Sequence, residues 1–153
     1  MKELIGQTVN IIRSSLIGIG IGILPGIGGS TAGLLAYTAT KNSSKHPEKF
    51  GTGIIDGVVA SESANNAVIG GSLIPLLTMG IPGNTVTAIF LGGLTIHGIN
   101  PGPLIFQKSG KYVYAIFIAL IVSNIFMLIF ERGGLRWFVK LLDIPKRYLL
   151  PII

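Results

Sequence analysis

The segment Leu24-Pro25-Gly26-Ile27-Gly28-Gly29 lies inside an apolar stretch, residues 14–40, that contains no charged residue. Proline has no backbone N–H and glycine accepts non-helical dihedral angles, so the segment predicts a break between two helices. Gly80-Ile81-Pro82-Gly83-Asn84 predicts a second break of the same kind. The apolar pieces on either side of the first break are each shorter than the roughly 20 residues that cross a bilayer as a helix. The pattern indicates discontinuous helices or re-entrant hairpins.

The composition of the chain is typical of a membrane protein. Hydrophobic residues make up 49% and charged residues 12% of its 153 residues, whereas soluble domains contain roughly 25% charged residues. The net charge is +6, but the basic residues lie between the apolar stretches and do not form a patch with interleaved aromatic residues, as a nucleic-acid surface does. We therefore expect an all-α membrane protein, a polytopic helical bundle with discontinuous helices or re-entrant hairpins, in a single membrane domain over residues 1–153, with no nucleic-acid partner.

Other segments extend the membrane pattern. Residues 112–130 are free of charge and predict an uninterrupted span. Residues 132–142 contain aromatic side chains and predict an interfacial turn or short helix. Another apolar segment begins at residues 149–153, so we expect the chain to be truncated there. The apolar run at residues 16–24 is not expected to be a secretory signal, because Pro25-Gly26 and a second apolar segment follow it in place of a cleavage site.

Glycines recur at four-residue intervals on both sides of the first break. Gly18 and Gly22 precede it, and Gly29 and Gly33 follow it. Small residues at this spacing form a helix face on which a second helix can approach closely. For Gly18 and Gly22 a packing role and a direct binding role are both open, whereas the glycines directly after Pro25 favour a binding loop.

The residues after each break suit the start of a helix. Ser30 follows the first break, and Asn84 and Thr85 follow the second; serine, threonine and asparagine are preferred where helices begin. A helix N-terminus carries unpaired N–H groups and about half a unit of positive charge. Unpaired backbone groups at membrane depth are tolerated where they line a cavity. The two breaks therefore predict a site that holds an anionic solute without lysine or arginine.

Two carboxylates are candidates for coupling to an ion gradient. Asp56 and Glu62 open a segment that becomes apolar further along the chain. Ionisable groups at membrane depth are costly and usually face an interior cavity. Helical spacing places Glu62 on one side of a helix with Asn65 or Asn66. The alternative is that both carboxylates lie at headgroup level and only flank a helix.

No enzyme motif is present in the sequence. The glycine-rich segment does not satisfy the dinucleotide-binding pattern G-x-G-x-x-G in any register, and Gly110-Lys111 is followed by Tyr112 where a P-loop requires serine or threonine. His46 is expected to be a solvated loop residue, and His97 a hydrogen-bonded residue at a helix end. The absence of cysteine excludes disulfides and thiol catalysis. We expect neither catalysis nor a cofactor or metal site.

Five motifs, in order along the chain, resemble those of one known family. They are Leu24 to Gly29, Lys45-His46-Pro47-Glu48-Lys49-Phe50-Gly51, Glu62-Ser63-Ala64-Asn65-Asn66-Ala67, Ile74-Pro75-Leu76-Leu77-Thr78-Met79-Gly80-Ile81-Pro82-Gly83 and His97-Gly98-Ile99-Asn100-Pro101-Gly102-Pro103. Together they are similar to the large membrane subunit of tripartite tricarboxylate transporters, the TctA family. An ordered series of motifs is far more specific than a single Pro-Gly turn.

The resemblance implies a multi-pass secondary transporter of the bacterial inner membrane. It implies uptake of a carboxylate such as citrate, driven by a sodium-ion or proton gradient, together with a periplasmic solute-binding protein and a small membrane subunit. Family members resemble one another in having two related halves, and this chain corresponds to the second, so another chain is expected to supply the first. The site positions that the resemblance carries over are Pro25, Gly26, Gly28, Gly29, Ser30, Pro82, Gly83, Asn84 and Thr85, with Asn65 and Asn66 added from the polar helix.

Two other functions are left open by the sequence. A non-transporting fragment or membrane scaffold remnant of such a permease would share every motif, and the missing half favours it. A channel-like pore would need a continuous polar stripe and symmetric oligomers, and the sequence displays no such stripe. The transporter is the function that we expect.

Overall fold

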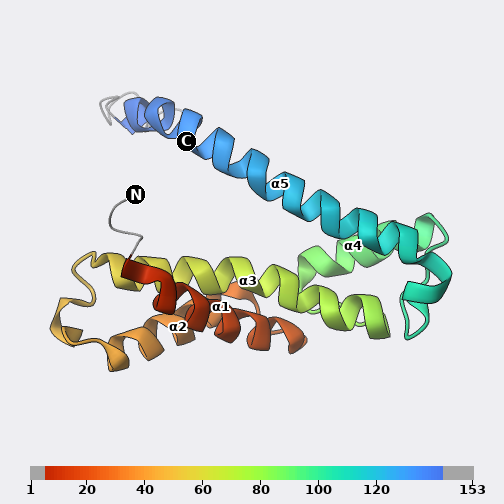
Figure 1. The fold of residues 1–153 in the computed structure, drawn as a ribbon, viewed down its shortest axis with the longest axis horizontal. Coiled ribbons are helices and arrows are strands. Elements are labelled where there is room, and N and C mark those ends of the chain that lie inside the picture. The colour runs from red at the N-terminus through yellow and green to blue at the C-terminus, as the bar shows by residue number, and fades with distance from the viewer. Residues whose placement is uncertain (1–5, 143–153) are drawn as a thin grey trace, which may run out of the picture. The chain divides into compact units, whose positions relative to one another are not determined.

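The computed structural model describes residues 6–142, with side chains as far as Leu135. Along this part of the chain lie the helices α1 (Thr8–Ile23), α2 (Gly29–Ser43), α3 (Ile55–Met79), α4 (Thr85–Ile96) and α5 (Ile105–Leu142), with the short 3-10 helix η2 (Pro47–Lys49) before α3 (Figure 1). The prediction of an all-α fold is confirmed for the described residues. The apolar segment at residues 149–153 lies outside them.

The chain divides into two compact units at the start of α5. The first unit ends at Lys108 and the second begins at Ser109. Ser109 has non-helical dihedral angles, φ −133° and ψ 23°, which interrupt α5 at this point. The first unit therefore contains α1 to α4, and the second contains the remainder of α5.

Among the described residues, α5 is the helix that is long and apolar enough to cross a membrane. Its segment Ile105–Leu135 has 31 residues, and an 18-residue stretch within it reaches a mean hydropathy of 2.6, whereas α1 and α4 are apolar but shorter. The span predicted at residues 112–130 lies within α5. Residues 132–142, predicted to form an interfacial turn or short helix, continue α5, and the side chains of Trp137 and Phe138 lie outside the described ones.

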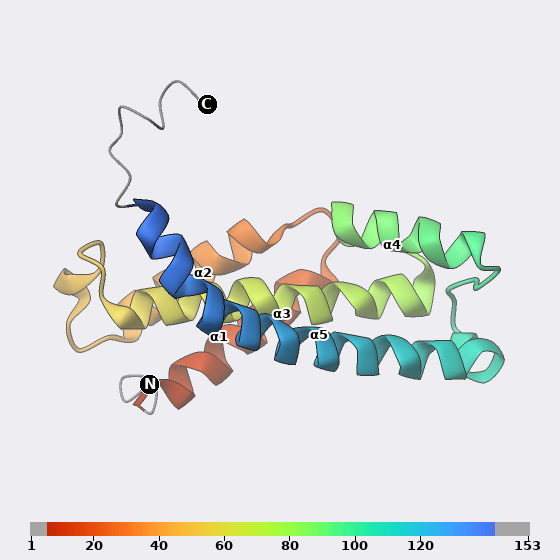
Figure 2. The same cartoon turned by 90° about the horizontal axis from the view of Figure 1, so that it is seen from above.

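Helices α1, α2 and α3 lie side by side and form the core of the first unit (Figures 1 and 2). Small side chains fill the contact between α2 and α3, where Ala32, Ala36, Ala60 and Ala64 are fully buried together with Val68. Small residues allow two helix backbones to approach closely, so packing of the backbones replaces a core of bulky side chains.

Glycines bring α1 and α3 into direct backbone contact. A Cβ atom added at Gly18 would overlap the carbonyl oxygen of Ala64, and one added at Gly22 would lie 2.5 Å from that of Val68. On α3, Gly71 lies equally close to the backbone of α1. Gly18 and Gly22 therefore pack helices together, and the close approach predicted from their spacing is confirmed.

Pro75 lies inside α3 and does not break it. It is buried, and α3 continues to Met79. Gly80, with φ +71°, ends the helix: its N–H donates to the carbonyl oxygen of Leu76 at 2.9 Å, and the Ile81 N–H donates to that of Pro75 at 3.2 Å. The bond from Gly80 to Leu76 is that of an αL C-cap, in which the left-handed residue is usually glycine. A proline so near the end of a helix removes a single hydrogen bond of the ladder.

The polar loop after α2 is held against the helices by an aromatic pair. The rings of Tyr37 and Phe50 meet edge to face with centroids 5.2 Å apart, and Phe50 is buried. His46 is exposed and lies 3.3 Å from the exposed carboxylate of Glu48, as expected of a solvated loop residue. His97 lies at the C-terminal end of α4, the position predicted from the sequence, and its backbone N–H donates to the carbonyl oxygen of Gly93 at 3.3 Å.

Candidate functional site

The two Pro-Gly segments meet within the first unit. Gly26 donates its backbone N–H to the carbonyl oxygen of Gly83 over 2.9 Å. Gly26 has φ +81°, a left-handed conformation that is favourable for glycine. Gly83 is buried, and a Cβ atom there would lie 3.0 Å from the Cβ of Ser72 and 3.1 Å from the carbonyl oxygen of Gly22. Residues 24–28 and 80–84 therefore form one structural feature, which we call the paired breaks.

Helix α4 begins at the paired breaks with a complete cap. The Oδ1 atom of Asn84 accepts from the Thr87 N–H at 2.9 Å, and the Oγ1 atom of Thr87 accepts from the Asn84 N–H at 2.9 Å. Thr85 is the first helical residue and is exposed. The prediction that Asn84 starts a helix is confirmed, and this capping box fixes the direction of the helix N-terminus.

Helix α2 begins at the paired breaks without a side-chain cap. Gly28 is its N-cap and Gly29 its first residue, so Ser30 lies within the first turn instead of capping it. The Thr31 N–H donates to the carbonyl oxygen of Gly28, whereas the N–H groups of Gly29 and Ser30 have no acceptor within residues 6–142. Helix α2 therefore presents unpaired donors and the positive end of its dipole beside the paired breaks.

A shallow groove with several polar side chains in its lining, which we call the α2–α3 groove, begins at the start of α2. It has a volume of about 520 Å³ and is lined by Gly29, Ser30, Gly33, Leu34, Tyr37, Ser61, Glu62 and Asn65. The amide oxygen of Asn65 packs so closely on Gly29 that a Cβ atom there would overlap it. Tyr37 and Ser61 were not identified as site residues from the sequence; each lies four residues from another lining residue, Gly33 and Asn65 respectively, and this helical spacing is the signal that could have found them.

The exposed polar residues Glu62, Asn65 and Asn66 of α3 line two different grooves. Asn65 lines the α2–α3 groove, Asn66 lines a second groove with Ile11 and Ser15 of α1, and Glu62 lines both. The Asn66 side chain donates to the carbonyl oxygen of Glu62 at 2.9 Å. The carboxylate of Glu62 has no hydrogen-bond or ion-pair partner within the described residues. Glu62 is therefore the polar residue of α3 that is open to both grooves.

Asp56 lies apart from the paired breaks. Its Oδ1 atom accepts from the side-chain amide of Gln7, and its carbonyl oxygen accepts from Asn10 at 2.9 Å. Both partners lie near the N-terminal end of α1, whereas the first break follows the C-terminal end of this 16-residue helix, about 24 Å away. The position of Asp56 in the first turn of α3 is that of a residue flanking a helix start.

A polar network that the sequence analysis did not identify joins α1 to α2 at the same end. The Oδ1 atom of Asn10 accepts from the hydroxyl of Thr40 at 2.9 Å and from that of Ser14 at 3.3 Å. The Nη2 atom of Arg13 donates to the Thr40 hydroxyl at 2.9 Å. Ser14 and Thr40 are buried. The available signal in the sequence was Arg13, a charged residue directly before a long uncharged stretch.

One protein family matches the chain over its full length. A model of the tripartite tricarboxylate transporter TctA family matches residues 1–153. The chain belongs to this family. Membership in the TctA family confirms the resemblance based on five ordered motifs, and it places the chain in a transporter family and not in a class of enzymes.

Two curated relatives of this TctA-family chain come from Agrobacterium vitis. An uncharacterized 52.8 kDa protein in the TAR-I ttuC' 3' region is 41% identical over 143 residues, which are 94% of this chain and 28% of the relative. An uncharacterized protein in the TAR-II ttuC' 3' region is 40% identical over 133 residues, 87% of this chain and 55% of the relative. The chain thus spans about half or less of each relative's length. No solved structure matches it.

Proposed function

We propose that this chain is part of a membrane permease for the uptake of tricarboxylates or related carboxylates, driven by an ion gradient. The hydrogen bond between Gly26 and Gly83 carries the proposal, because it joins two interruptions of the helical chain at one place. Irregular backbone at membrane depth is tolerated where it lines a cavity, and transporters build solute and ion sites there. Membership in the TctA family supports a tricarboxylate as the solute class.

The paired breaks and the start of the α2–α3 groove are proposed to bind the solute. The unpaired N–H groups of Gly29 and Ser30 and the positive end of α2 supply donors and electrostatic potential for a carboxylate. The N–H of Gly26 is already bonded to Gly83 and is not available to the solute. Gly26 instead contributes its left-handed conformation, which shapes the loop. The remaining proposed residues shape the loops, begin α4 or line the flanking grooves; they are Pro25, Gly28, Asn65, Asn66, Pro82, Asn84 and Thr85.

Glu62 is proposed to couple solute binding to a cation. It lines the same groove as Gly29 and Ser30, where its negative charge would repel a carboxylate solute. A proton or sodium ion on Glu62 removes this repulsion, so the cation and the solute each strengthen the binding of the other. Asp56 is the second proposed residue for cation coupling. Because it lies at the opposite end of α1 from the paired breaks, it would bind a cation apart from the solute.

The complete permease is proposed to contain more than this chain. Since the chain covers 28% and 55% of its two relatives, we propose that another chain supplies the first half and the facing wall of the solute site. A periplasmic solute-binding protein and a small membrane subunit are the other proposed partners, in a multi-pass assembly of the bacterial inner membrane. The long apolar helix α5 is the segment proposed to cross the bilayer completely.

Solute binding tests the proposal directly. Membranes from cells that produce this chain together with a chain supplying the first half should retain radiolabelled citrate, or another carboxylate that competes with it. The Gly83→Ala variant should retain less, whereas Gly92→Ala should behave as the unmodified chain, because a Cβ atom at Gly92 meets no neighbour within 4 Å. Equal retention by the two variants, or no retention of any carboxylate, would contradict the proposal and favour a non-transporting fragment or scaffold.

A further inference from the structure

Arg13 is a cationic side chain that has no carboxylate partner within the described residues. Its Nη2 atom donates to the hydroxyl of Thr40 at 2.9 Å and to Oδ1 of Asn10 at 3.5 Å. Its Nε atom is buried without a hydrogen-bond partner, and no bond is formed by Nη1 within the described part of the chain. A guanidinium carries five N–H donors and matches the geometry of phosphate oxygens. Arg13 therefore has donors available for an anion.

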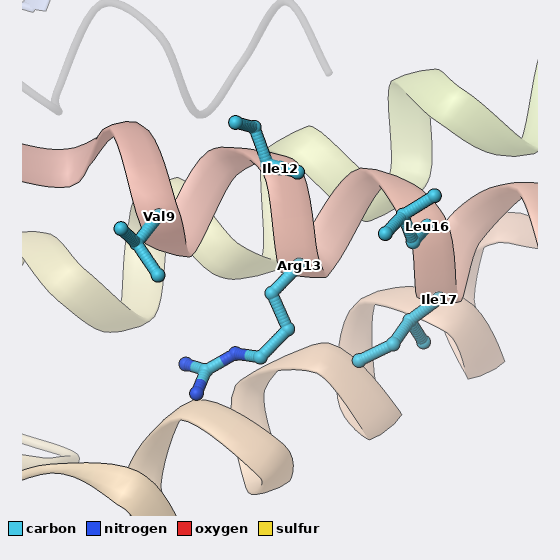
Figure 3. Close-up of a pocket in the computed structure, with 5 residues that line it drawn as sticks. All are labelled: Val9, Ile12, Arg13, Leu16 and Ile17. Carbon is cyan, nitrogen blue, oxygen red and sulfur yellow. The ribbon is translucent and has the colours of Figure 1, made fainter.

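The side chain of Arg13 lines an apolar groove on α1 and extends from that helix toward α2 (Figure 3). The other lining residues are Val9, Ile12, Leu16 and Ile17, and the groove has a volume of about 530 Å³. Val9, Ile12 and Leu16 are 78%, 57% and 63% exposed, and their spacing of three and four residues makes a continuous apolar stripe. A matching ligand has an apolar chain next to an anionic group.

The end of the first unit that carries Arg13 is rich in positive charge. Arg13 is bonded to Thr40 near the C-terminal end of α2. Lys41 follows directly, and Lys45 and Lys49 lie in the next loop; all of these lysines are exposed. Clusters of basic side chains beside a bilayer attract anionic headgroups.

Among the residues that the structure describes, the carboxylates at this end do not neutralise Arg13. Glu48 pairs with His46 in the loop at 3.3 Å, and the side chain of Asp56 accepts from Gln7. Neither carboxylate forms an ion pair with Arg13. Arg13 follows the first residue of α1 by five positions, about 8 Å along the helix axis, so in a membrane its guanidinium can reach headgroup depth.

We propose that Arg13 and the apolar groove of α1 form a binding site for an anionic phospholipid. The acyl chain lies along Val9, Ile12 and Leu16, and the headgroup phosphate accepts hydrogen bonds from the guanidinium. This inference rests on the membrane setting of the proposed function. A zwitterionic phospholipid has the same acyl chains but a headgroup without net charge. The site should therefore bind anionic phospholipids more tightly than zwitterionic ones.

Native mass spectrometry of the full chain released from nanodiscs tests the site. In nanodiscs that contain equal amounts of phosphatidylglycerol and phosphatidylcholine, the unmodified chain should retain mainly phosphatidylglycerol. Arg13→Gln should lower this retention about fivefold, the effect of one basic group near an anionic surface, and Arg13→Lys should restore part of it. Lys111→Gln, which removes an exposed charge in the second unit, is the matched control and should change nothing.

Several outcomes would overturn the lipid site. The first two are equal retention of both lipids by the unmodified chain and undiminished retention of phosphatidylglycerol by the Arg13→Gln variant. The others are displacement of the lipid by millimolar inorganic phosphate and loss of the lipid when the first-half chain is co-produced and covers α1. The comparison of the two lipids needs no variant, so it stands even if Arg13→Gln fails to fold. Because the assay contains no carboxylate solute, its failure is distinguishable from failure of citrate binding.

Discussion

The backbone nitrogen of Gly26 and the carbonyl oxygen of Gly83 lie 2.9 Å apart and join the two interruptions of the helical chain. Each partner is glycine for a different physical reason. Gly26 has a positive φ of 81°, whereas Gly83 lies too close to Ser72 and to the backbone of α1 to carry a side chain without a shift of its neighbours. The contact between the breaks therefore depends on both glycines, and it can be tested at either.

Replacement of Gly83 by alanine should destabilise the first unit by about 1–3 kcal/mol, the usual effect of an added methyl group in a packed site. The added Cβ would lie 3.0 Å from Ser72. Denaturant unfolding in detergent, followed by circular dichroism, measures the change. The control is Gly92→Ala in the open middle of α4, which should be neutral or stabilising because alanine is the better helix former. An unchanged unfolding midpoint for Gly83→Ala would rule out close packing of Gly83 against Ser72 and Gly22.

Replacement of Gly18 by alanine should separate α1 from α3. The new Cβ would overlap the carbonyl oxygen of Ala64, and because this atom belongs to a helix backbone it cannot rotate away. We expect a loss of about 1–3 kcal/mol in the free energy of unfolding. Gly20→Ala on the open side of the same helix should cause no such loss. Equal effects of the two substitutions would show that helix propensity, and not contact between the helices, determines the result.

Replacement of Asn84 by alanine should remove the cap of α4. The Asn84 side chain accepts the Thr87 N–H, and loss of such a cap costs about 1 kcal/mol. Asn84→Ser keeps an oxygen acceptor at the N-cap and should restore most of the stability. Unfolding measurements on the three chains decide the point, and citrate retention should fall in parallel if the direction of α4 matters to the site. A serine variant as unstable as the alanine variant would contradict the capping role.

Replacement of Glu62 by glutamine should abolish the dependence of uptake on the ion gradient. Glutamine keeps the size of the side chain but cannot take up a proton or bind a cation through a negative charge. Uptake of labelled solute is measured in cells that carry the complete permease, with the gradient intact and collapsed. Glu131→Gln, which removes an exposed carboxylate from α5, is the control. Gradient-dependent uptake by the Glu62 variant would remove Glu62 from the coupling step.

The pKa of the Glu48 carboxyl is lowered from its ordinary value of 4.5 by its own backbone N–H first and by His46 second. Its contribution to folding is therefore present at neutral pH and is lost as the pH falls through the lowered pKa. Titration by carbon NMR should give a midpoint below 4.5. His46→Ala should raise this midpoint only in part, because the backbone donor remains. Complete recovery of the ordinary value in that variant would assign the shift to His46 alone.

One expectation from the sequence was wrong because neighbouring residues compete for the same structural role. Ser30 was expected to start α2, but the extended conformation of Gly28 makes that glycine the N-cap. Pro75 lies inside the third helix, although proline disfavours a helix interior, and the helix ends at Gly80. Neither result follows from a single residue, because the end of a helix depends on the conformations of several residues together.

The sequence by itself determined the helical class, the breaks after Pro25 and Pro82, and the glycine faces of α1, because proline, glycine and helical spacing act over a few residues. Only the tertiary structure decided that Gly26 meets Gly83, that Asn65 and Asn66 line different grooves, and that Arg13 reaches Thr40. Such contacts join residues far apart in the chain. They depend on how closely the alanine and glycine faces allow α1, α2 and α3 to pack, and local sequence does not specify this packing.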